Sequence, residues 1–204
     1  MEKGSIRDAI ASRRSIRRFT KEPVDAGELV SILQVAFFAP APHHTIPWRF
    51  AVVVDEAAKR RLAESMAARW REDMRRDGID PKRSSVLSDK SIQKLTNAPA
   101  LILACLVTQG LDTYPDRRRQ DAELGMALLS LGAAIQNIML AAAEAGYGSC
   151  WIAAPIFAPE EARESLQLPS EWIPQALLII GRPDPCYIPR SRPDLDLDSF
   201  VSVI

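Results

Sequence analysis

Two groups of side chains in the sequence have the types and spacing of a chemical site. One is the stretch APAPHHTIPWRF at residues 39–50, in which His43 and His44 are the only histidines of the chain. Adjacent histidines suggest metal ligands, but a zinc site needs three or four ligands in all, and neighbouring residues on extended backbone point in opposite directions. The chain offers no third histidine and no Cys-x-x-Cys pair. We therefore predict that this stretch binds no metal.

The prolines around the two histidines suggest a different role. Pro40, Pro42 and Pro47 fix the backbone φ angle and remove amide donors, so they stiffen a loop between a predicted helix and a predicted strand. A stiff loop of this kind can hold imidazole edges against a planar, polar ligand at little entropic cost. A rigid connector with solvated histidines is the alternative that this stretch alone leaves open.

The second group consists of arginines near both ends of the chain. Residues 13–17 read RRSIR at the end of a predicted helix, and Arg190 and Arg192 form a shorter cluster in the tail. Arginine binds phosphate in bidentate fashion, so both clusters suit a phosphate group. They share one phosphate only if the fold brings the chain ends together, and solvated charge clusters are the alternative. The sequence holds no Gly-x-Ser-x-Gly motif, which argues against a serine hydrolase triad.

The composition limits the classes of partner and compartment. The chain has 204 residues, 47% of them hydrophobic, and 26 basic residues balance 26 acidic ones. This neutrality argues against a nucleic-acid or membrane surface as the main partner. Three widely spaced cysteines fit a reducing compartment, and the polar N-terminus has no signal-peptide core. We expect a cytoplasmic protein without a membrane span, and the longest apolar run, residues 124–143, is predicted to be a buried helix.

The remaining sequence predicts alternating helices and strands in one domain. Asp25 and Glu28 have the spacing of a capping box at the start of a helix over 26–38. Periodicity predicts further helices over 4–14, 56–77, 91–97, 121–145 and from about 158, and strands over 50–54, 101–107, 149–153 and 176–180. Residues 78–90 and 110–119 are predicted to be loops, the first of them polar and mobile. Because no linker or repeat separates these elements, residues 1–204 are predicted to form a single α+β domain.

Four motifs, in order along the chain, resemble those of nitroreductase-family flavoproteins. Arg13–Phe19 (RRSIRRF) resembles the opening RRSxRxF motif of the family. Residues 39–50 resemble its SPSxxNxQPWxF loop, with Ala41 and Ile46 in place of the usual serine and glutamine. Gly146–Ile152 (GYGSCWI) resembles the turn and strand that line the flavin. The IGRP and RSR segments that begin at 180 and 190 resemble the closing GxP…KxR pattern.

A second likeness is to the FMN-binding C-terminal domain of FbiB, a bifunctional protein of coenzyme F420 biosynthesis. It is carried by APHHT at 41–45, YPD at 114–116, DAE at 121–123 and GSCWIA at 148–153. That domain is associated with the reduction of a dehydro precursor of coenzyme F420. The resemblance covers the reductase half only, so it implies that activity alone.

The family resemblance implies a fold and an assembly. The expected fold is nitroreductase-like, with a central, mostly antiparallel sheet flanked by helices, in an intertwined homodimer with two FMN molecules at the subunit interface. The last 23 residues hold four prolines and no core pattern. A C-terminal tail over 182–204 that is exchanged between subunits would give them a surface to lie on. The expected partners are thus a second copy and a small-molecule substrate, with no nucleic acid and no membrane.

The resemblance also assigns FMN contacts by position. The phosphate and the ribityl chain would be bound by residues from both chain ends, namely Arg13, Arg14, Ser15, Arg17, Arg190 and Arg192. The central loop of the partner subunit would contact the flavin through His43, His44 and Thr45. Lys94 would contact the polar edge of the flavin. The third motif would lie along the flat ring, through Gly148, Ser149, Trp151 and Ile152.

The implied activity is that of an FMN-dependent oxidoreductase with ping-pong kinetics. A reduced donor, NAD(P)H or F420H2, passes hydride to the flavin, and an electron-poor acceptor then takes it in the same slot. Reduction of a dehydro-F420 precursor competes with broad nitro or quinone reduction, and the basic segment 117–119 favours an anionic acceptor. A carbon–carbon double bond also needs a proton, which water or Tyr114 can supply. The motifs leave room for two further functions, a flavin-binding protein without turnover and a flavin-cleaving enzyme.

Overall fold

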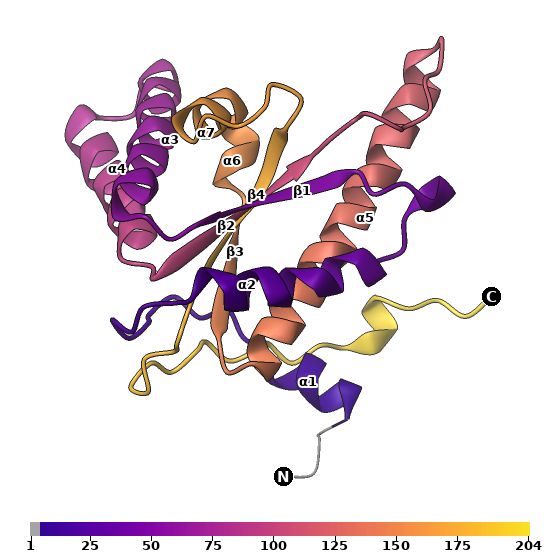
Figure 1. Cartoon of the computed structure of the whole chain (residues 1–204), viewed down its shortest axis with the longest axis horizontal. Coiled ribbons are helices and arrows are strands. Elements are labelled where there is room, and N and C mark those ends of the chain that lie inside the picture. Colours follow the sequence, from indigo (N-terminus) through magenta and orange to yellow (C-terminus); the bar gives the residue numbers. More distant parts are fainter. Residues whose placement is uncertain (1–4) are drawn as a thin grey trace.

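A four-stranded antiparallel sheet lies at the centre of the computed structural model, which describes residues 5–204 (Figure 1). Its strand order is β1-β2-β4-β3. The bounds are β1 Trp48–Val53, β2 Ala100–Leu106, β3 Gly148–Ile152 and β4 Ile173–Gly181. The pairing of the two central strands is interrupted once, by a register shift between Ala104 and Cys105. The predicted α+β fold with an antiparallel sheet is confirmed.

Helices cover both faces of this sheet (Figure 1). The α-helices are α1 Ile6–Ser12, α2 Ala26–Leu33, α3 Glu56–Arg76, α4 Pro81–Thr96, α5 Arg117–Glu144, α6 Ala154–Phe157 and α7 Pro159–Ser165. Short 3-10 helices η1, η2 and η3 span Gln34–Phe38, Pro42–His44 and Leu197–Ser199. One face of the sheet packs on α2 and α5, and the other packs on α3, α4 and α7.

The middle of the sheet is buried on both faces, which explains the continuous apolar sequence of its strands. All seven residues of β2 are buried. Because side chains alternate along a strand, Ile102 and Leu106 join the core under α2 and α5, whereas Leu101 and Leu103 join the core under α3 and α7. The buried sheet is therefore the central layer against which the long helix α5 and both chain ends are held.

Most of residues 78–90 form a helix, so the predicted mobile loop is wrong. α4 begins at Pro81, since proline fits the first turn of a helix. The Asp80 side chain caps this turn by accepting a hydrogen bond from the Arg83 amide at 3.0 Å. The connection from α3 is confined to residues 77–80. The helical pattern was hidden because few of its residues face the core, namely Ser84, Ser88 and Leu95.

The other predicted elements agree with the structure to within a few residues. α5 begins at Arg117, earlier than predicted, because Asp116 accepts a hydrogen bond from the Arg119 amide at 2.9 Å and caps the helix. The helix predicted over 26–38 is α2 followed by η1, and it ends before Pro40. The short helix α6 is absent from the sequence prediction. Residue 4, the first of the predicted N-terminal helix, lies outside the described residues.

α5 is long and apolar enough to cross a membrane by length and composition, with a mean hydropathy of 1.7 over 18 residues. In this fold its second half lies in the core of the protein, with Leu131, Ile135 and Ile138 buried. The prediction of a buried helix over 124–143 therefore holds for that half. The first half is different, since Leu124 and Leu129 are exposed.

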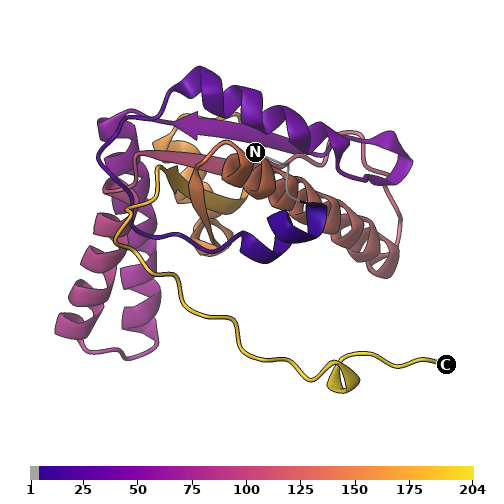
Figure 2. The same ribbon diagram turned by 90° about the horizontal axis from the view of Figure 1, so that it is seen from below.

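The two ends of the chain lie side by side. Phe19 forms a bridge with Pro183, and the Thr20 amide donates to the Arg182 carbonyl at 2.9 Å. Beyond these contacts the tail runs as an extended segment away from the sheet (Figure 2). It exposes apolar side chains, namely Ile188, Leu195, Phe200, Val201, Val203 and Ile204.

Candidate functional site

Residues 13–17, the start of β3 and the tail converge at one end of the sheet. The Ile16 amide donates to the Ser149 carbonyl at 2.9 Å, which ties the N-terminal segment to β3. Arg192 reaches back from the tail and donates from Nη2 to the Arg13 carbonyl at 3.0 Å. The two arginine clusters therefore lie close together, as a shared phosphate requires.

A cavity of about 300 Å³ opens at this point. Its walls include Arg13 and Arg14 from the N-terminal segment, Gly148 and Ser149 from β3, and Pro189 from the tail. Three of the segments singled out from the sequence thus contribute to one cavity. Four of the predicted FMN contacts line it directly.

Gly148 is required by the close approach of β3 to the N-terminal segment. A Cβ atom at this position would lie 2.7 Å from the Ile16 side chain, closer than real Cβ contacts come. The next residue, Ser149, is 2% exposed. The small residues of the third motif are therefore explained by packing as well as by their place in the cavity wall.

The arginines around the cavity are not neutralised by carboxylates. Within residues 5–204 there is no ion pair to Arg13, Arg14, Arg17, Arg190 or Arg192. The guanidinium groups of Arg14, Arg17 and Arg192 donate to backbone carbonyls. A group of uncompensated guanidinium cations attracts an anion and can bind it with charge-assisted hydrogen bonds.

A buried tyrosine beside the cavity is absent from the sequence prediction. Tyr147 is 5% exposed and donates to the Glu28 carboxylate, and the Arg182 guanidinium lies 4.0 Å from its ring centroid. Burial and the hydrogen bond to Glu28 raise the pKa of Tyr147 to about 12. Arg182 also donates to the Ala145 carbonyl at 2.6 Å. This network fixes the turn from α5 to β3 that forms one wall of the cavity.

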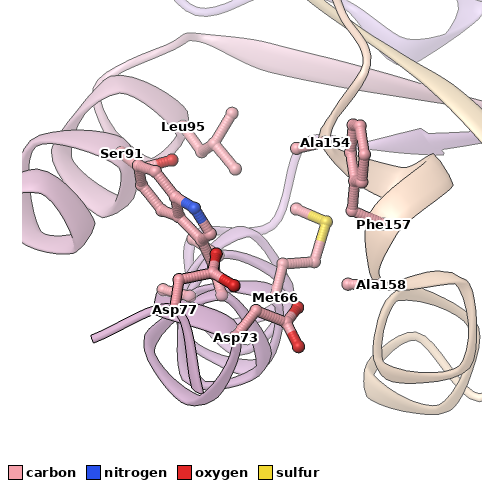
Figure 3. Close-up of a pocket in the computed structure, with 11 residues that line it drawn as sticks. Met66, Asp73, Asp77, Ser91, Leu95, Ala154, Phe157 and Ala158 are labelled. Atoms are coloured by element: carbon pink, nitrogen blue, oxygen red, sulfur yellow. The ribbon is translucent and has the colours of Figure 1, made fainter. Parts of the chain in front are cut away.

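A larger cavity, of about 440 Å³, lies on the other face of the sheet between α3, α4 and α6 (Figure 3). Met66, Leu95 and Phe157 point into it, and Asp73 lies at its side. Ala154, which closely follows the end of β3, also lines it. The apolar cavity is therefore close in sequence to the strand on which the ring contacts are predicted.

The histidine loop lies at the opposite end of α5 from the arginines. His43 and His44 are exposed in η2, and both have a positive φ angle, 54° and 55°, which is uncommon for residues with side chains. The Thr45 amide and hydroxyl both donate to the Pro42 carbonyl, at 3.0 and 2.8 Å. One chain alone does not bring these three residues to the arginine cavity.

The remaining predicted flavin contacts lie on β3 and on α4. Trp151 is 41% exposed and Ile152 is half-buried. Lys94 is exposed on the last turn of α4, beside Leu95 of the larger cavity. These residues do not line the arginine cavity, and their contact with a flavin stays a prediction.

Tyr114 lies far from the arginine cavity within one chain. It precedes α5, whose 28 residues span roughly 40 Å, and the cavity is at the other end of that helix. Burial and the nearby Asp112 carboxylate raise the pKa of Tyr114. The Arg119 guanidinium lies 5.2 Å from its ring centroid. A role of Tyr114 as proton donor would thus concern another copy of the chain.

Residues 10–182 match the sequence profile of the nitroreductase family. The chain belongs to this family. The sequence prediction of an oxidoreductase with a nitroreductase-like fold is confirmed by this match, whereas the likeness to the FbiB domain stays a prediction.

This chain resembles several known proteins over most of their length. It is 30% identical over 192 residues to the 5,6-dimethylbenzimidazole synthase of Rhodospirillum rubrum, covering 88% of this chain and 84% of that protein. The structure of a BluB-like flavoprotein from Clostridium difficile has a TM-score of 0.81 at 22% identity, over 99% of this chain and 100% of its own. A mutant of the FMN and NADPH-dependent nitroreductase NfnB, from a Sphingopyxis strain, has a TM-score of 0.70 at 26% identity, covering 98% of this chain and 99% of that chain.

Proposed function

We propose that this nitroreductase-family protein is an FMN-dependent oxidoreductase, and that the cavity lined by Arg13, Arg14 and Gly148 takes the FMN phosphate. The observation that supports this most is the meeting of arginines from both chain ends, without ion pairs in the described chain, at a cavity of about 300 Å³. A phosphate there would accept the charge-assisted hydrogen bonds that suit these guanidinium groups. The similarity to a nitroreductase named as FMN and NADPH-dependent supports the same cofactor.

The residues around the cavity suit FMN in their arrangement as well as in their charge. β3 runs from Gly148 at the cavity to Trp151 and Ile152. A cofactor with its phosphate beside Gly148 would therefore place its ring toward the end of this strand. Ser15 and Arg17 follow directly on the cavity residues and would hold the ribityl chain, and Arg190 would join the phosphate from the tail.

A second copy of the chain completes the site in this proposal. His43, His44 and Thr45 lie at the far end of α5 from the phosphate cavity, so they would reach a flavin only if a partner subunit presents them. The apolar side chains exposed on the first half of α5 and on the tail give such a partner a surface to bury. Exchange of the tail, residues 182–204, and a cytoplasmic location belong to the same proposal.

FMN, when bound, supplies hydride transfer between a reduced donor, NAD(P)H or F420H2, and an electron-poor acceptor. The chain supplies binding and orientation, since the arginines would hold the phosphate and Lys94 would meet the polar edge of the ring. The apolar walls of the 440 Å³ cavity, with Met66, Leu95 and Phe157, would exclude water and take the apolar part of a substrate. No side chain of the protein is required to transfer the hydride itself.

The acceptor is either a dehydro-F420 precursor or a broad set of nitro and quinone compounds. The basic segment 117–119 favours the anionic precursor, but Arg117 pairs with Asp121, and Arg119 pairs with Asp116. Arg118 is therefore the one arginine of this segment without an ion pair in the described chain. The electrostatic argument for the F420 precursor is weaker than the sequence indicates, and broad nitro or quinone reduction is the second candidate.

Turnover assays separate the two acceptors. The purified protein would be reduced with NADPH or F420H2 and then offered the F420 precursor, a nitroaromatic compound and a quinone in turn. Reoxidation by the precursor supports the biosynthetic role, and reoxidation by the nitro and quinone compounds alone supports the broad reductase. A bound flavin that neither donor reduces would contradict both and favour a protein without turnover.

The phosphate site is tested by alanine at both Arg190 and Arg192. We expect FMN affinity to fall by about 2 kcal/mol or more, roughly 30-fold, because each charge-assisted hydrogen bond is worth about 1.5–3 kcal/mol. Flavin fluorescence measures this affinity, and circular dichroism verifies the fold, because Arg192 also holds carbonyls of the N-terminal segment. Arg60→Ala, an exposed arginine of α3 without a proposed role, is the matched control and should bind FMN normally. A colourless, monomeric protein that ignores added FMN would reject the proposal.

A further inference from the structure

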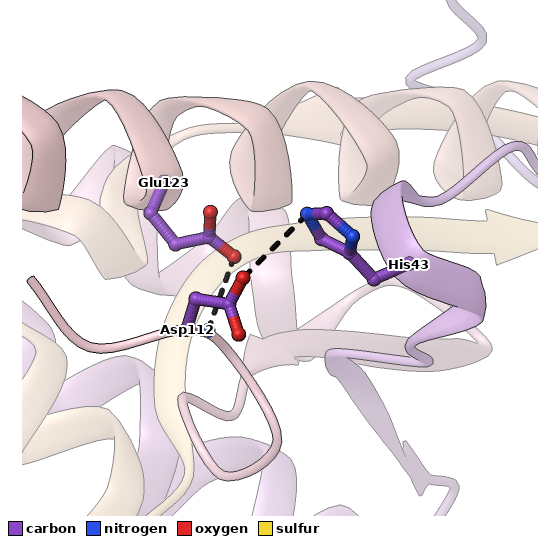
Figure 4. Close-up of side chains that lie close together, drawn as sticks. All are labelled: His43, Asp112 and Glu123. Atoms are coloured by element: carbon purple, nitrogen blue, oxygen red, sulfur yellow. Dashed lines mark hydrogen bonds and ion pairs between the residues drawn. The ribbon is translucent and has the colours of Figure 1, made fainter.

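His43, Asp112 and Glu123 come from three separate segments and meet near the start of α5 (Figure 4). One potential ligand atom from each lies within 4.8 Å of the other two. His43 Nε2 is 3.7 Å from Asp112 Oδ2, which is too long for a hydrogen bond. The Asp112 amide, in contrast, donates to Glu123 Oε1 at 3.3 Å. The three side chains face one another without a direct hydrogen bond between them in the described chain.

Glu123 is the member of this cluster that requires a partner. It is 1% exposed, and its Oε2 atom has no hydrogen-bond partner within residues 5–204. The carboxylate is directed toward His43 and Asp112 (Figure 4). Burial of a carboxylate oxygen without a donor or a counter-ion is unfavourable. A cation between the three side chains would supply the interaction that Glu123 lacks.

We propose that His43, Asp112 and Glu123 bind one divalent transition-metal ion, and that Zn²⁺ suits this set best. Zinc accepts imidazole and carboxylate ligands at about 2.0–2.2 Å and can keep water in a fourth position. The imidazole argues against Mg²⁺ and Ca²⁺, which prefer oxygen ligands alone. Ligand atoms around such an ion lie about 3.5 Å apart. The side chains of His43 and Asp112 are 60% and 57% exposed, so they have room to move the short distance inward.

The two adjacent histidines differ in this respect. His43 faces Asp112 and Glu123, whereas no carboxylate in the described chain pairs with His44. The sequence argument against a metal was that two adjacent histidines point in opposite directions and that the chain has no third histidine. It could not include the carboxylate ligands that the fold brings from residues 112 and 123. A bound ion would tie the central loop to the start of α5. Within one chain the cluster lies at the other end of α5 from the arginine cavity. In the proposed dimer the same His43 also faces the flavin of the partner subunit, so zinc binding is measured on protein without FMN.

The test is a titration of the chelator-treated full chain with Zn²⁺ by isothermal calorimetry. We expect saturable binding of one ion per chain and little heat from Mg²⁺. His43→Ala and Glu123→Gln should each weaken Zn²⁺ binding by roughly tenfold or more, since each removes one of three ligands. His44→Ala is the matched control and should bind Zn²⁺ as the wild type does.

Thermal melts distinguish loss of a ligand from loss of the fold. Without metal, Glu123→Gln should be at least as stable as the wild type, because it removes a buried carboxylate oxygen that lacks a partner. With Zn²⁺, the wild type and His44→Ala should gain stability and Glu123→Gln should not. Absence of saturable Zn²⁺ binding, or equal binding by wild type and His43→Ala, would overturn the proposal.

Discussion

Both halves of α5 contain leucine, alanine and methionine, but their surroundings differ. The second half, residues 131–144, lies in the core, and Leu131 and Ile135 are 2% and 1% exposed. The first half, residues 117–130, is also rich in leucine, but Leu129 is 77% exposed. Within a single chain, therefore, only one half of the longest helix has a fully buried leucine. The apolar content of a helix indicates that a partner surface exists, and it does not indicate whether that surface belongs to the same chain.

Other features lie at the same exposed first half of α5. A cavity of about 310 Å³ is lined there by Pro42, Met126 and Leu129, next to the histidine loop. Phe38, which is 83% exposed, lies between that loop and α2. The arginine cavity and the network around Tyr147 lie at the buried second half of α5. In the proposed dimer the first half of α5 would meet the partner, and the second half would hold the phosphate site of its own chain.

The largest expected effect comes from the buried half. Ile135→Ala should lower the free energy of unfolding by about 3 kcal/mol, because it removes buried methylene groups and leaves a cavity in the core under α2 and α5. Urea denaturation followed by circular dichroism measures this change. Val30→Ala, on α2 and 55% exposed, is the matched control and should change the stability by less than about 0.5 kcal/mol. Equal effects of the two substitutions would show that α5 is not anchored in the core.

The exposed half gives the next largest effect, and it concerns assembly. Leu129→Glu should leave the stability of a single chain nearly unchanged, because the side chain already faces solvent there. If this surface meets a second copy, the buried charge should weaken the dimer by roughly 2 kcal/mol, about 30-fold in its dissociation constant. Sedimentation equilibrium of the wild type and the variant measures this. A dimer that is insensitive to Leu129→Glu would place the interface elsewhere.

The sequence predicted the parts of the fold that carry a local pattern. β2 and β4 were evident because burial on both faces makes their sequences continuously apolar. The second part of α4 was predicted as a helix over 91–97, but its first part, 81–90, was missed because its serines and lysines lack a clear apolar face. Pro81 after Asp80 is nevertheless a typical signal for the start of a helix. The exposure of Leu129 could not be foreseen, because burial of a helix face depends on which other elements reach it.

The candidate site was predictable only in part, for a similar reason. The arginine types at 13–17 and 190–192 were visible in the sequence, but their meeting depends on pairing between chain ends far apart in sequence. The family resemblance supplied that meeting, and local pattern did not. The contact of Tyr147 with Glu28 joins two distant elements without any local signal. The approach of Asp112 to His43 is of the same kind.

The smallest effect concerns the end of the buried half, where Tyr147 closes α5. Its amide donates to the Ala142 carbonyl at 2.8 Å, and its hydroxyl donates to Glu28. Burial, and after it Glu28, raises the pKa of Tyr147 to about 12, against about 10 in an unfolded chain. The fold therefore favours the neutral phenol, and this stabilisation is complete below pH of about 10. Between pH of about 10 and 12 the folded chain binds more protons than the unfolded chain, so stability falls as pH rises.

Comparison of the wild type with Tyr147→Phe isolates this contribution. Between pH 10 and 12, the free energy of unfolding of the wild type should fall by about 1.5 kcal/mol more than that of the variant. The expected value is below the full shift because the Glu28 side chain is 42% exposed and solvent screens its charge. Burial also raises the pKa of Cys105 to about 12, but this thiol is present in both proteins and its effect cancels. Parallel pH profiles from urea denaturation would mean that the hydroxyl of Tyr147 is solvated in solution, and that the turn beside the arginine cavity is held by Arg182 alone.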